Sequence, residues 1–436
     1  MINQDALYWI WLAEKCGAAS MELDKLLQKY QNPFDIYSLE NEEIEQLDGI
    51  SDNLKAELCR KNLDKSYETL RFCKTERIDI ITYSDKRYPA RLKNIQDPPV
   101  LLYCKGHFPS FNDTLCIAMV GTRNMSEYGK QSAYKIAYEL SAAGVLVVSG
   151  MALGIDGVAA SGALMAGGKT VAVLGCGIDV VYPKNHARLC EQIARHGAVI
   201  TEYPPKTEPR GYNFPKRNRI ISALCQGTLI VEAAEKSGAL ITAKRAIEQG
   251  REVFAIPGKI NDEGAAGPNS LIREGAYAVL EADDILKHYE FLYSDVIDKN
   301  KLAKARLKMP KADAALEKYG LAYAVGGEET VEKTYSPRKK RKNKVEEVEV
   351  KSVEAAKSVE TEAAKPEGER DTDNTAVESL DAVTRRILEA LPYDKAVSID
   401  KLSLDGISVT ETITALTMLE IYGLVASLPG GLYIRK

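Results

Sequence analysis

The middle of the chain alternates short apolar runs with longer amphipathic stretches. The runs are CIAMV, VLVVS, TVAVLG, AVIT, TLIVEA and EVFAIPG, and helix-length segments such as SEYGKQSAYKIAYELSAAG separate them. Strands that are apolar throughout are buried on both faces, and their alternation with helices is typical of a parallel sheet covered by helices on both sides. We therefore predict an α/β domain over residues 78–293, built on a doubly wound parallel sheet.

The residues before this domain follow a helical pattern. Apolar positions recur at helical spacing in residues 6–16 and 22–30, and residues 47–58 (LDGISDNLKAEL) have the form of a helix-hairpin-helix turn with Gly49 at a tight corner. We predict a helical module, SAM-like or helix-hairpin-helix-like, over residues 1–75. Such a turn can bind DNA phosphates through backbone N–H groups, but the acidic residues around it favour a purely structural corner.

Residues 295–378 lose the apolar pattern. A basic block at residues 338–344 precedes a repetitive acidic stretch with few large apolar side chains. Such a stretch cannot bury enough surface to offset the entropy lost on ordering, so we expect a charged disordered linker. The basic block either contacts nucleic acid or is an ordinary solvated charge run, and we favour the second interpretation.

The last residues, 379–436, are predicted to form a winged helix. Helical stretches at 382–391, 397–403 and 410–423 precede a hairpin that turns at residues 429–431, which is the element order of that fold. A winged helix usually contacts duplex DNA through its third helix. Here the third helix carries Glu411 and Glu420 and no basic residue, so contact with a protein, or non-specific contact, is at least as consistent with the sequence.

Composition and charge narrow the class of protein. No run is long and apolar enough for a transmembrane helix, the first residues lack a signal-peptide pattern, and the eight cysteines contain no CxxC pair. We expect a cytoplasmic protein with free thiols and no membrane attachment.

By count, residues 1–80 carry a net charge of −6 and residues 112–260 carry a net charge of +5. This asymmetry points to an anionic ligand on the middle domain, with chance scatter of charge as the alternative.

Glycine-rich and basic turns follow the predicted strands. Ligands of open α/β sheets bind at the carboxyl ends of the strands, where helix N-termini attract anions. Several such turns on one edge suit a single nucleic-acid strand better than one nucleotide. Tyr212 and Phe214 lie beside the basic cluster and are either base-stacking platforms or part of the core edge. The residues that stand out are Gly121, Arg123, Ser149, Gly150, Tyr212, Phe214, Lys216, Arg217, Arg219, Ser237 and Gly238.

Sequence patterns of common enzymes are absent. The chain has no GxxxxGK[ST], no GxGxxG after the first strand, no HExxH and no GxSxG, so we expect no cofactor, no metal and no catalytic residue. Asp156 and Glu232 are the carboxylates at strand exits and would be the catalytic candidates. We favour a helix cap for Asp156 and a loop-orienting hydrogen bond for Glu232.

Taken together, several segments resemble the DNA-processing protein A (DprA/Smf) family over roughly residues 80–290. These segments are GTR, SGMALGID, YPP, FPKRNRIIS, LIVEAAEKSGALITA, FAIPG and GPNSLIREGA. The resemblance implies a Rossmann-like domain that binds and protects single-stranded DNA, forms homodimers and loads the RecA recombinase in natural transformation. Single-strand-binding protein would be a further partner.

The strand-binding residues follow from this resemblance together with the strand-exit turns. For Asn218 and Arg219 the alternative is capping and pairing within the fold. The expected set is Gly121, Thr122, Arg123, Ser149, Gly150, Lys216, Arg217, Asn218, Arg219, Ser237 and Gly238.

Two other functions stay open at this point. Gly227-Thr228 and Glu232 are similar to part of the site of LOG-type nucleotide phosphoribohydrolases, although the PGGxGTxxE run of those enzymes is absent. The other open function is that of an adaptor that mainly binds proteins.

The apolar residues 239–243, with Ala246 and Ile247, either lie at a dimer seam or simply cover the sheet.

Overall fold

The computed structural model describes two parts of the chain. They comprise residues 4–18 and 20–321 and, near the C-terminus, residues 382–392, 397–398, 412, 415–416, 419, 424–428 and 432–435. The chain divides into two compact units, residues 1–339 and 340–436, and each is described by itself.

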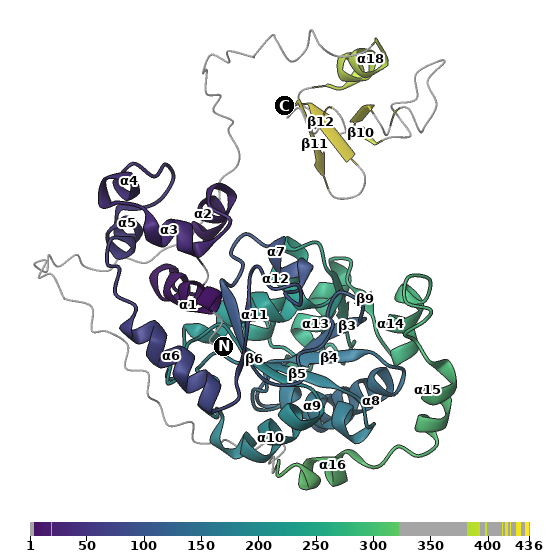
Figure 1. Ribbon diagram of the computed structural model, residues 1–436. Helices are drawn as coiled ribbons and strands as arrows, with labels where there is room; N and C mark the ends of the chain where they lie inside the picture. Colours follow the sequence, from purple (N-terminus) through teal and green to yellow (C-terminus); the bar gives the residue numbers. More distant parts are fainter. Residues whose placement is uncertain are drawn as a thin grey trace, which may run out of the picture. The chain divides into compact units, whose positions relative to one another are not determined.

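The first unit is organised around a nine-stranded sheet (Figure 1). Its order is β1-β2-β6-β5-β4-β3-β7-β8-β9; β2 is antiparallel to β1 and β6, and all other neighbours are parallel. The strands are β1 (Asp79–Thr82), β2 (Leu101–Gly106), β3 (Cys116–Val120), β4 (Leu146–Ser149), β5 (Thr170–Val173), β6 (Ala198–Thr201), β7 (Gly227–Ile230), β8 (Glu252–Ala255) and β9 (Tyr277–Ala278). The predicted doubly wound parallel sheet is confirmed.

Helices cover both faces of this sheet because alternate strand residues point to opposite sides. Ile117 and Met119 of β3 belong to one apolar core, which the helices α8, α9 and α10 share, whereas Cys116 and Ala118 belong to the other, shared with α7, α11 and α12. These helices are α7 (Ala90–Lys93), α8 (Glu127–Ala142), α9 (Ile155–Met165), α10 (Ala187–His196), which follows the 3-10 turn η1 (Lys184–His186), α11 (Asn213–Leu224), α12 (Gly238–Glu248), α13 (Glu263–Arg273) and α14 (Ala282–Tyr289).

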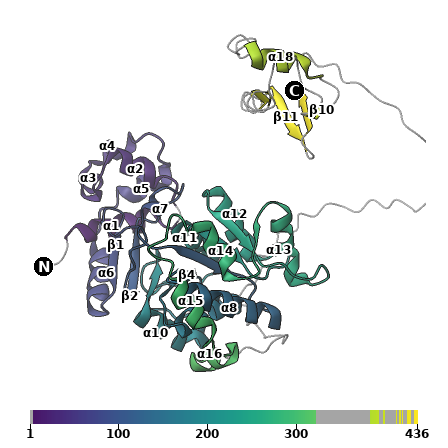
Figure 2. The ribbon, with the colours of Figure 1, turned by 90° about the vertical axis from the view of Figure 1, so that its right-hand side faces the viewer.

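An N-terminal group of helices packs beside β1 and β2 (Figure 2). The group consists of α1 (Gln4–Cys16), α2 (Leu23–Lys29), α3 (Pro33–Ser38), α4 (Asn41–Glu45), α5 (Asp52–Leu58) and α6 (Asp64–Thr75). Trp9 and Leu12 of α1 are buried in the same core as Leu101 and Tyr103 of β2. The helical module is therefore fixed to the sheet by shared apolar packing and is not a loose appendage.

The predicted hairpin corner in this module forms through internal contacts. Gly49 has a φ of +71°, its carbonyl accepts a hydrogen bond from Lys25 Nζ at 3.0 Å, and Ile50 is buried below it. At the start of α5, Ser51 donates both its backbone N–H and its hydroxyl to the Glu22 carboxylate. Because Glu22 occupies donors that a phosphate would use, the contacts favour the structural corner over a DNA-binding one.

The expectation of a linker beginning at residue 295 is wrong for residues 295–321. This stretch contains α15 (Lys299–Arg306), which packs on α8, and α16 (Ala312–Lys318), which packs on both α8 and α9. Leu302 and Leu316 are buried, and Arg306 pairs with the buried Glu139 at 2.8 Å. The few apolar side chains are spaced so that they meet apolar side chains elsewhere in the first unit. The local pattern of this stretch cannot reveal such distant contacts. The rest of the predicted linker, 322–378, lies outside the described residues.

The second unit carries the elements of a winged helix. Helix α18 (Ala382–Ala390) is followed by β10 (Val397–Ser398), β11 (Val425–Leu428) and β12 (Leu432–Arg435), and the strands form an antiparallel sheet in the order β10-β12-β11. The predicted hairpin is confirmed. The helix predicted at 397–403 is wrong where it is described, because Val397 and Ser398 pair with β12. Among the described residues of both units, no helix has the length and apolar character needed to cross a membrane.

Candidate nucleic-acid interface

The main candidate site lies where the direction of the chain connections reverses. β3 and β7 are neighbours, but the chain runs from β3 toward β4 on one side and from β7 toward β8 on the other. Ligands of open α/β sheets bind outside the carboxyl ends of the strands at such a point. A cavity of about 420 Å³ opens there, between the residues after β3 and the first turns of α9, α11 and α12. We call it the switch-point cavity.

The structure brings most of the sequence-predicted residues to this cavity. Its lining includes Gly121, Thr122, Arg123, Arg217, Asn218, Ser237 and Gly238. Two helices begin here: Gly154 is the N-cap residue of α9, and Ser237 caps α12. Unpaired N–H groups and the helix dipole make such ends favourable for anions. The cavity therefore offers phosphate-binding groups from several elements at once.

Two glycines allow the loop after β3 to lie against α9. A Cβ on Gly121 would approach Ile155 Cγ1 to 2.6 Å, and one on Gly154 would approach the Thr122 carbonyl oxygen to 2.3 Å. Gly154 also has a φ of +75°, a conformation that glycine adopts at little cost. The close approach places Arg123 at the N-terminus of α9. Gly154 was noticed in the sequence only as a member of a glycine-rich turn.

Arg123 is the exposed cation at this site. Its guanidinium lies over the Phe214 ring, 5.6 Å from the ring centre, and Phe214 packs against Tyr182 with 5.4 Å between ring centres. Phe214 is half-buried, whereas Tyr212 is 59% exposed. Phe214 thus supports the guanidinium from the core edge, and Tyr212 is the ring with a free face. Sequence analysis did not select Tyr182. The signal that could have found it is its position as an aromatic residue after GCGIDVV, at the exit of a predicted strand.

Arg217 lines the cavity but uses its guanidinium inside the protein. It is buried and donates to the carbonyl oxygens of Gly150, at 2.8 Å, and of Val173. Burial lowers the pKa of Arg217 to about 10, which leaves it charged at neutral pH. The same burial raises the pKa of Asp156, against the opposing effect of the Arg217 charge. The prediction that Arg217 contacts the strand directly is therefore wrong for its guanidinium, because that group already donates hydrogen bonds to these two carbonyls.

Ser149 and Gly150 do not point into the switch-point cavity. The buried Ser149 hydroxyl donates to the Met119 carbonyl at 2.9 Å, and the Gly150 N–H donates to Asp156 at 3.0 Å. Asp156 also accepts from the Ala152 N–H at 3.4 Å. These bonds hold the loop between β4 and α9, so Ser149 and Gly150 support the site from outside the cavity, whereas Asp156 lines the cavity and fixes the loop. The favoured structural role for Asp156 agrees with these contacts.

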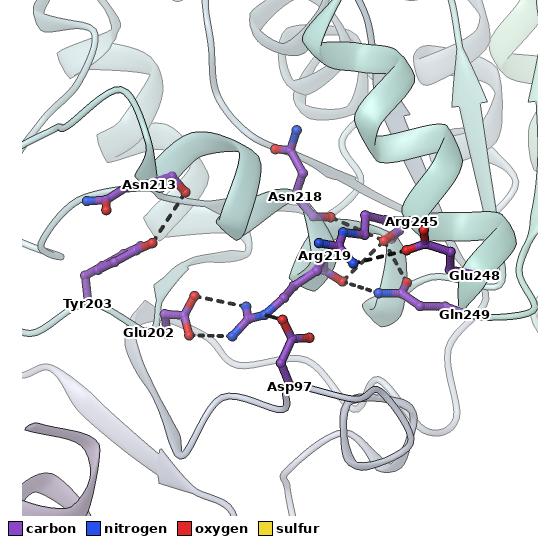
Figure 3. A network of polar contacts seen from close by, with 10 residues as sticks. Asp97, Glu202, Tyr203, Asn213, Asn218, Arg219, Arg245, Glu248 and Gln249 are labelled. Carbon is purple, nitrogen blue, oxygen red and sulfur yellow. Dashed lines mark hydrogen bonds and ion pairs between the residues drawn. The ribbon is translucent and has the colours of Figure 1, made fainter. Parts of the chain in front are cut away.

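Arg219 is a correction to the predicted set. Figure 3 shows its guanidinium between two carboxylates: both terminal nitrogens bond Glu202, at 2.9 and 2.7 Å, and Nε lies 3.1 Å from Asp97. The residue is only 1% exposed. Burial by itself would lower the pKa of Arg219, but Glu202 and Asp97 outweigh it and raise the pKa. A buried arginine with two acidic partners is not available to DNA, and the alternative of pairing within the fold holds for this residue.

Lys216 and Glu232 do not line the switch-point cavity. Lys216 is exposed but lines a different cavity on the other side of α11. Glu232 accepts hydrogen bonds from the Ser126 backbone N–H at 2.9 Å and from the Ser126 hydroxyl. It thereby fixes the first turn of α8, which is the loop-orienting role favoured from the sequence.

Comparison with known proteins assigns the class and then the family. Residues 79–290 match the family model described as DNA recombination-mediator protein A, and residues 371–431 match the DprA winged helix domain. The chain is 40% identical to DNA processing protein DprA of Bacillus subtilis over 240 residues, 54% of this chain and 81% of that protein. It is 45% identical to DNA processing protein DprA of Streptococcus pneumoniae over 212 residues, 48% of this chain and 73% of that protein.

A solved structure agrees with these matches. The X-ray structure of DprA from Streptococcus pneumoniae superposes with a TM-score of 0.58 at 37% identity, covering 64% of this chain and 97% of that one. The Rossmann-like sheet, the switch-point cavity and the winged helix define a DNA-processing type of protein. The chain belongs to the DprA/Smf family, as its sequence motifs predicted.

Proposed function

We propose that this protein binds single-stranded DNA, protects incoming strands and loads the RecA recombinase in natural transformation, without covalent chemistry of its own. The observation that carries the proposal is the convergence of two helix N-termini and the exposed Arg123 on one cavity. Phosphate is the group that such an arrangement binds best. Membership in a family of DNA-processing proteins makes the phosphate that of DNA.

A strand fits the site better than a free nucleotide. The cation and the helix N-termini come from the ends of different strands and line one open cavity, and Tyr212 offers an exposed aromatic face in the cavity on the other side of α11. Few side chains at the cavity are suited to reading base edges. Sequence-independent single-strand binders combine such backbone contacts with aromatic stacking. Of the expected residues, Gly121, Thr122, Arg123, Asn218, Ser237 and Gly238 are the ones we propose to face the strand.

The direct test is a titration of labelled oligo-dT and of duplex DNA at two salt concentrations. We expect a clear preference for the single strand. Each neutralised phosphate on a single strand contributes about 0.7 to the slope of log affinity against log salt, so four or five contacts give a slope of about −3. Equal affinity for duplex, or binding that salt does not change, would contradict the proposal.

The proposed partners are RecA, single-strand-binding protein and a second copy of this chain. For the dimer, α12 is the helix of interest, but its apolar residues are divided. Ala239, Thr242, Ala243 and Ala246 are buried against the sheet side, while Ile241 and Ile247 are 41% and 59% exposed. Burial favours the sheet-cover interpretation for the first four, Leu240 is partly buried against the same core, and the exposed Ile241 and Ile247 are the residues that we propose for the dimer seam.

Delivery to RecA is tested by strand exchange with single strands that single-strand-binding protein has already coated. The coat blocks strand exchange by RecA. Adding this protein should relieve that block, because a binder without chemistry acts by changing which protein holds the strand. An Arg123→Ala variant should relieve it less, in proportion to its loss of DNA affinity. If the unmodified protein binds DNA but leaves the block in place, it is a passive single-strand binder.

A further inference from the structure

A second cavity, of about 550 Å³, lies between the N-terminal helical module and the residues that precede α11. Glu14 of α1 and Lys65 of α6 line one side, and residues 202–204, 206–208, 210, 212 and 213 line another. Since α1 and β2 share one apolar core, these walls are held together by packing. We call it the module cavity. It is distinct from the switch-point cavity, and the two have no lining residue in common.

The rim of the module cavity is basic. Lys65, Lys206, Arg210 and Lys216 are all exposed there. Three acidic residues also line the cavity: Glu202 is paired with the buried Arg219, Glu208 is 4.0 Å from Arg210, and the partly buried Glu14 accepts a hydrogen bond from the Ser66 hydroxyl at 3.3 Å. Two of the rim lysines come from elements far apart in the sequence, α6 and α11. Charges of one sign that the tertiary fold gathers around a cavity indicate an anionic ligand.

Helix α11 separates the two cavities. Tyr212, Asn213 and Lys216 line the module cavity, whereas Phe214, Arg217 and Asn218 line the switch-point cavity. A helix with its side chains is about 10 Å wide, a span that a few nucleotides cover even at the about 3.4 Å rise of a duplex strand. Tyr212 stands at the start of α11, and its hydroxyl accepts a hydrogen bond from Arg210 at 3.1 Å; its exposed ring lines the module cavity, and the adjacent Gly211 lines the switch-point cavity.

We propose that the single strand continues from the switch-point cavity past Tyr212 into the module cavity, where Lys65, Lys206, Arg210 and Lys216 bind its next phosphates. The N-terminal helical module is then part of the strand-binding surface, through Lys65, and does not use its hairpin corner for this. The proposal rests on the proposed single-strand binding and extends it to a second subsite.

The experiment compares two oligo-dT lengths on the full chain. Single-strand sites run from about 4 to about 16 nucleotides, so the shorter length should fill the switch-point cavity alone and the longer one both cavities. The test variant is Lys65→Ala with Arg210→Ala, both exposed positions. The matched control is Lys304→Ala with Lys308→Ala, two exposed lysines that line neither cavity. Arg123→Ala reports on the switch-point cavity.

The test variant should bind the long oligonucleotide on the order of tenfold more weakly, which is the combined loss of two solvent-exposed charge pairs with phosphate. Its salt slope should fall by about 1.4 for two lost phosphate contacts, while affinity for the short oligonucleotide stays that of the unmodified chain and the control changes neither. If Arg123→Ala weakens both lengths and the test variant matches the unmodified protein at both, the module cavity is not a subsite, and single-strand binding stands. If the unmodified protein binds neither length, both proposals fail.

Discussion

Arg123→Ala is expected to weaken single-strand binding by roughly 1 to 3 kcal/mol while leaving the protein folded, because it removes charge-assisted hydrogen bonds to phosphate. The guanidinium is exposed and lies over the Phe214 ring, so little folding free energy depends on it. The measurement is a binding isotherm with oligo-dT beside thermal unfolding of the same sample.

Two further variants sharpen the Arg123 experiment. Arg123→Lys keeps the charge but loses the planar fork, and should recover only part of the affinity. Arg273→Ala, at an exposed position at the end of α13 that does not line the switch-point cavity, should leave affinity unchanged. If Arg123→Ala binds as tightly as the unmodified chain, the strand lies elsewhere. If it unfolds, Arg123 has a structural role.

Arg219→Ala, three residues after the exposed Lys216, should instead reduce stability and not DNA affinity. It leaves the Glu202 and Asp97 carboxylates at a buried site without their cation. Removing one partner of a buried ion pair typically costs about 3 to 5 kcal/mol. We therefore expect a large drop in the free energy of unfolding, measured by urea titration. The fraction of the protein that stays folded should keep its affinity for DNA.

A double substitution separates charge burial from loss of packing. In Arg219→Met with Glu202→Leu, apolar side chains replace the closest pair, and part of the lost stability should return because only the less buried Asp97 is then left without its cation. A variant Arg219→Ala of unchanged stability and sharply reduced DNA affinity would overturn the internal role of this residue and restore the original expectation of a DNA contact.

The residues that sequence analysis placed correctly are those whose role depends on local chain geometry. Gly121 and Ser237 follow buried apolar strands, and the carboxyl ends of parallel strands meet at one edge of a sheet, so period and turn chemistry suffice to bring them together. The family segments had the same basis, since they are largely the glycine-rich turns at these strand ends. The winged-helix hairpin likewise follows from a two-strand pattern around Pro429, Gly430 and Gly431.

The basic run on α11 was not decidable from the sequence. Lys216, Arg217 and Arg219 look alike in a linear pattern, but successive residues on a helix point about 100° apart. One faces the module cavity, one bonds the carbonyls of Gly150 and Val173, and one is buried between Glu202 and Asp97. Only the partners that the fold supplies distinguish a DNA contact from an internal ion pair.

The sequence by itself determined the doubly wound sheet, the family and the sheet edge on which the candidate site lies, because apolar periodicity and glycine turns are local properties. The tertiary structure decided what depends on residues distant in the chain. It ordered α15 and α16 by giving Leu302 and Leu316 a groove to fill, and it turned Val397 and Ser398 into a strand by pairing them with β12. It also placed Lys65 opposite Lys216, because burial and cation gathering are properties of packed surfaces and not of neighbouring positions.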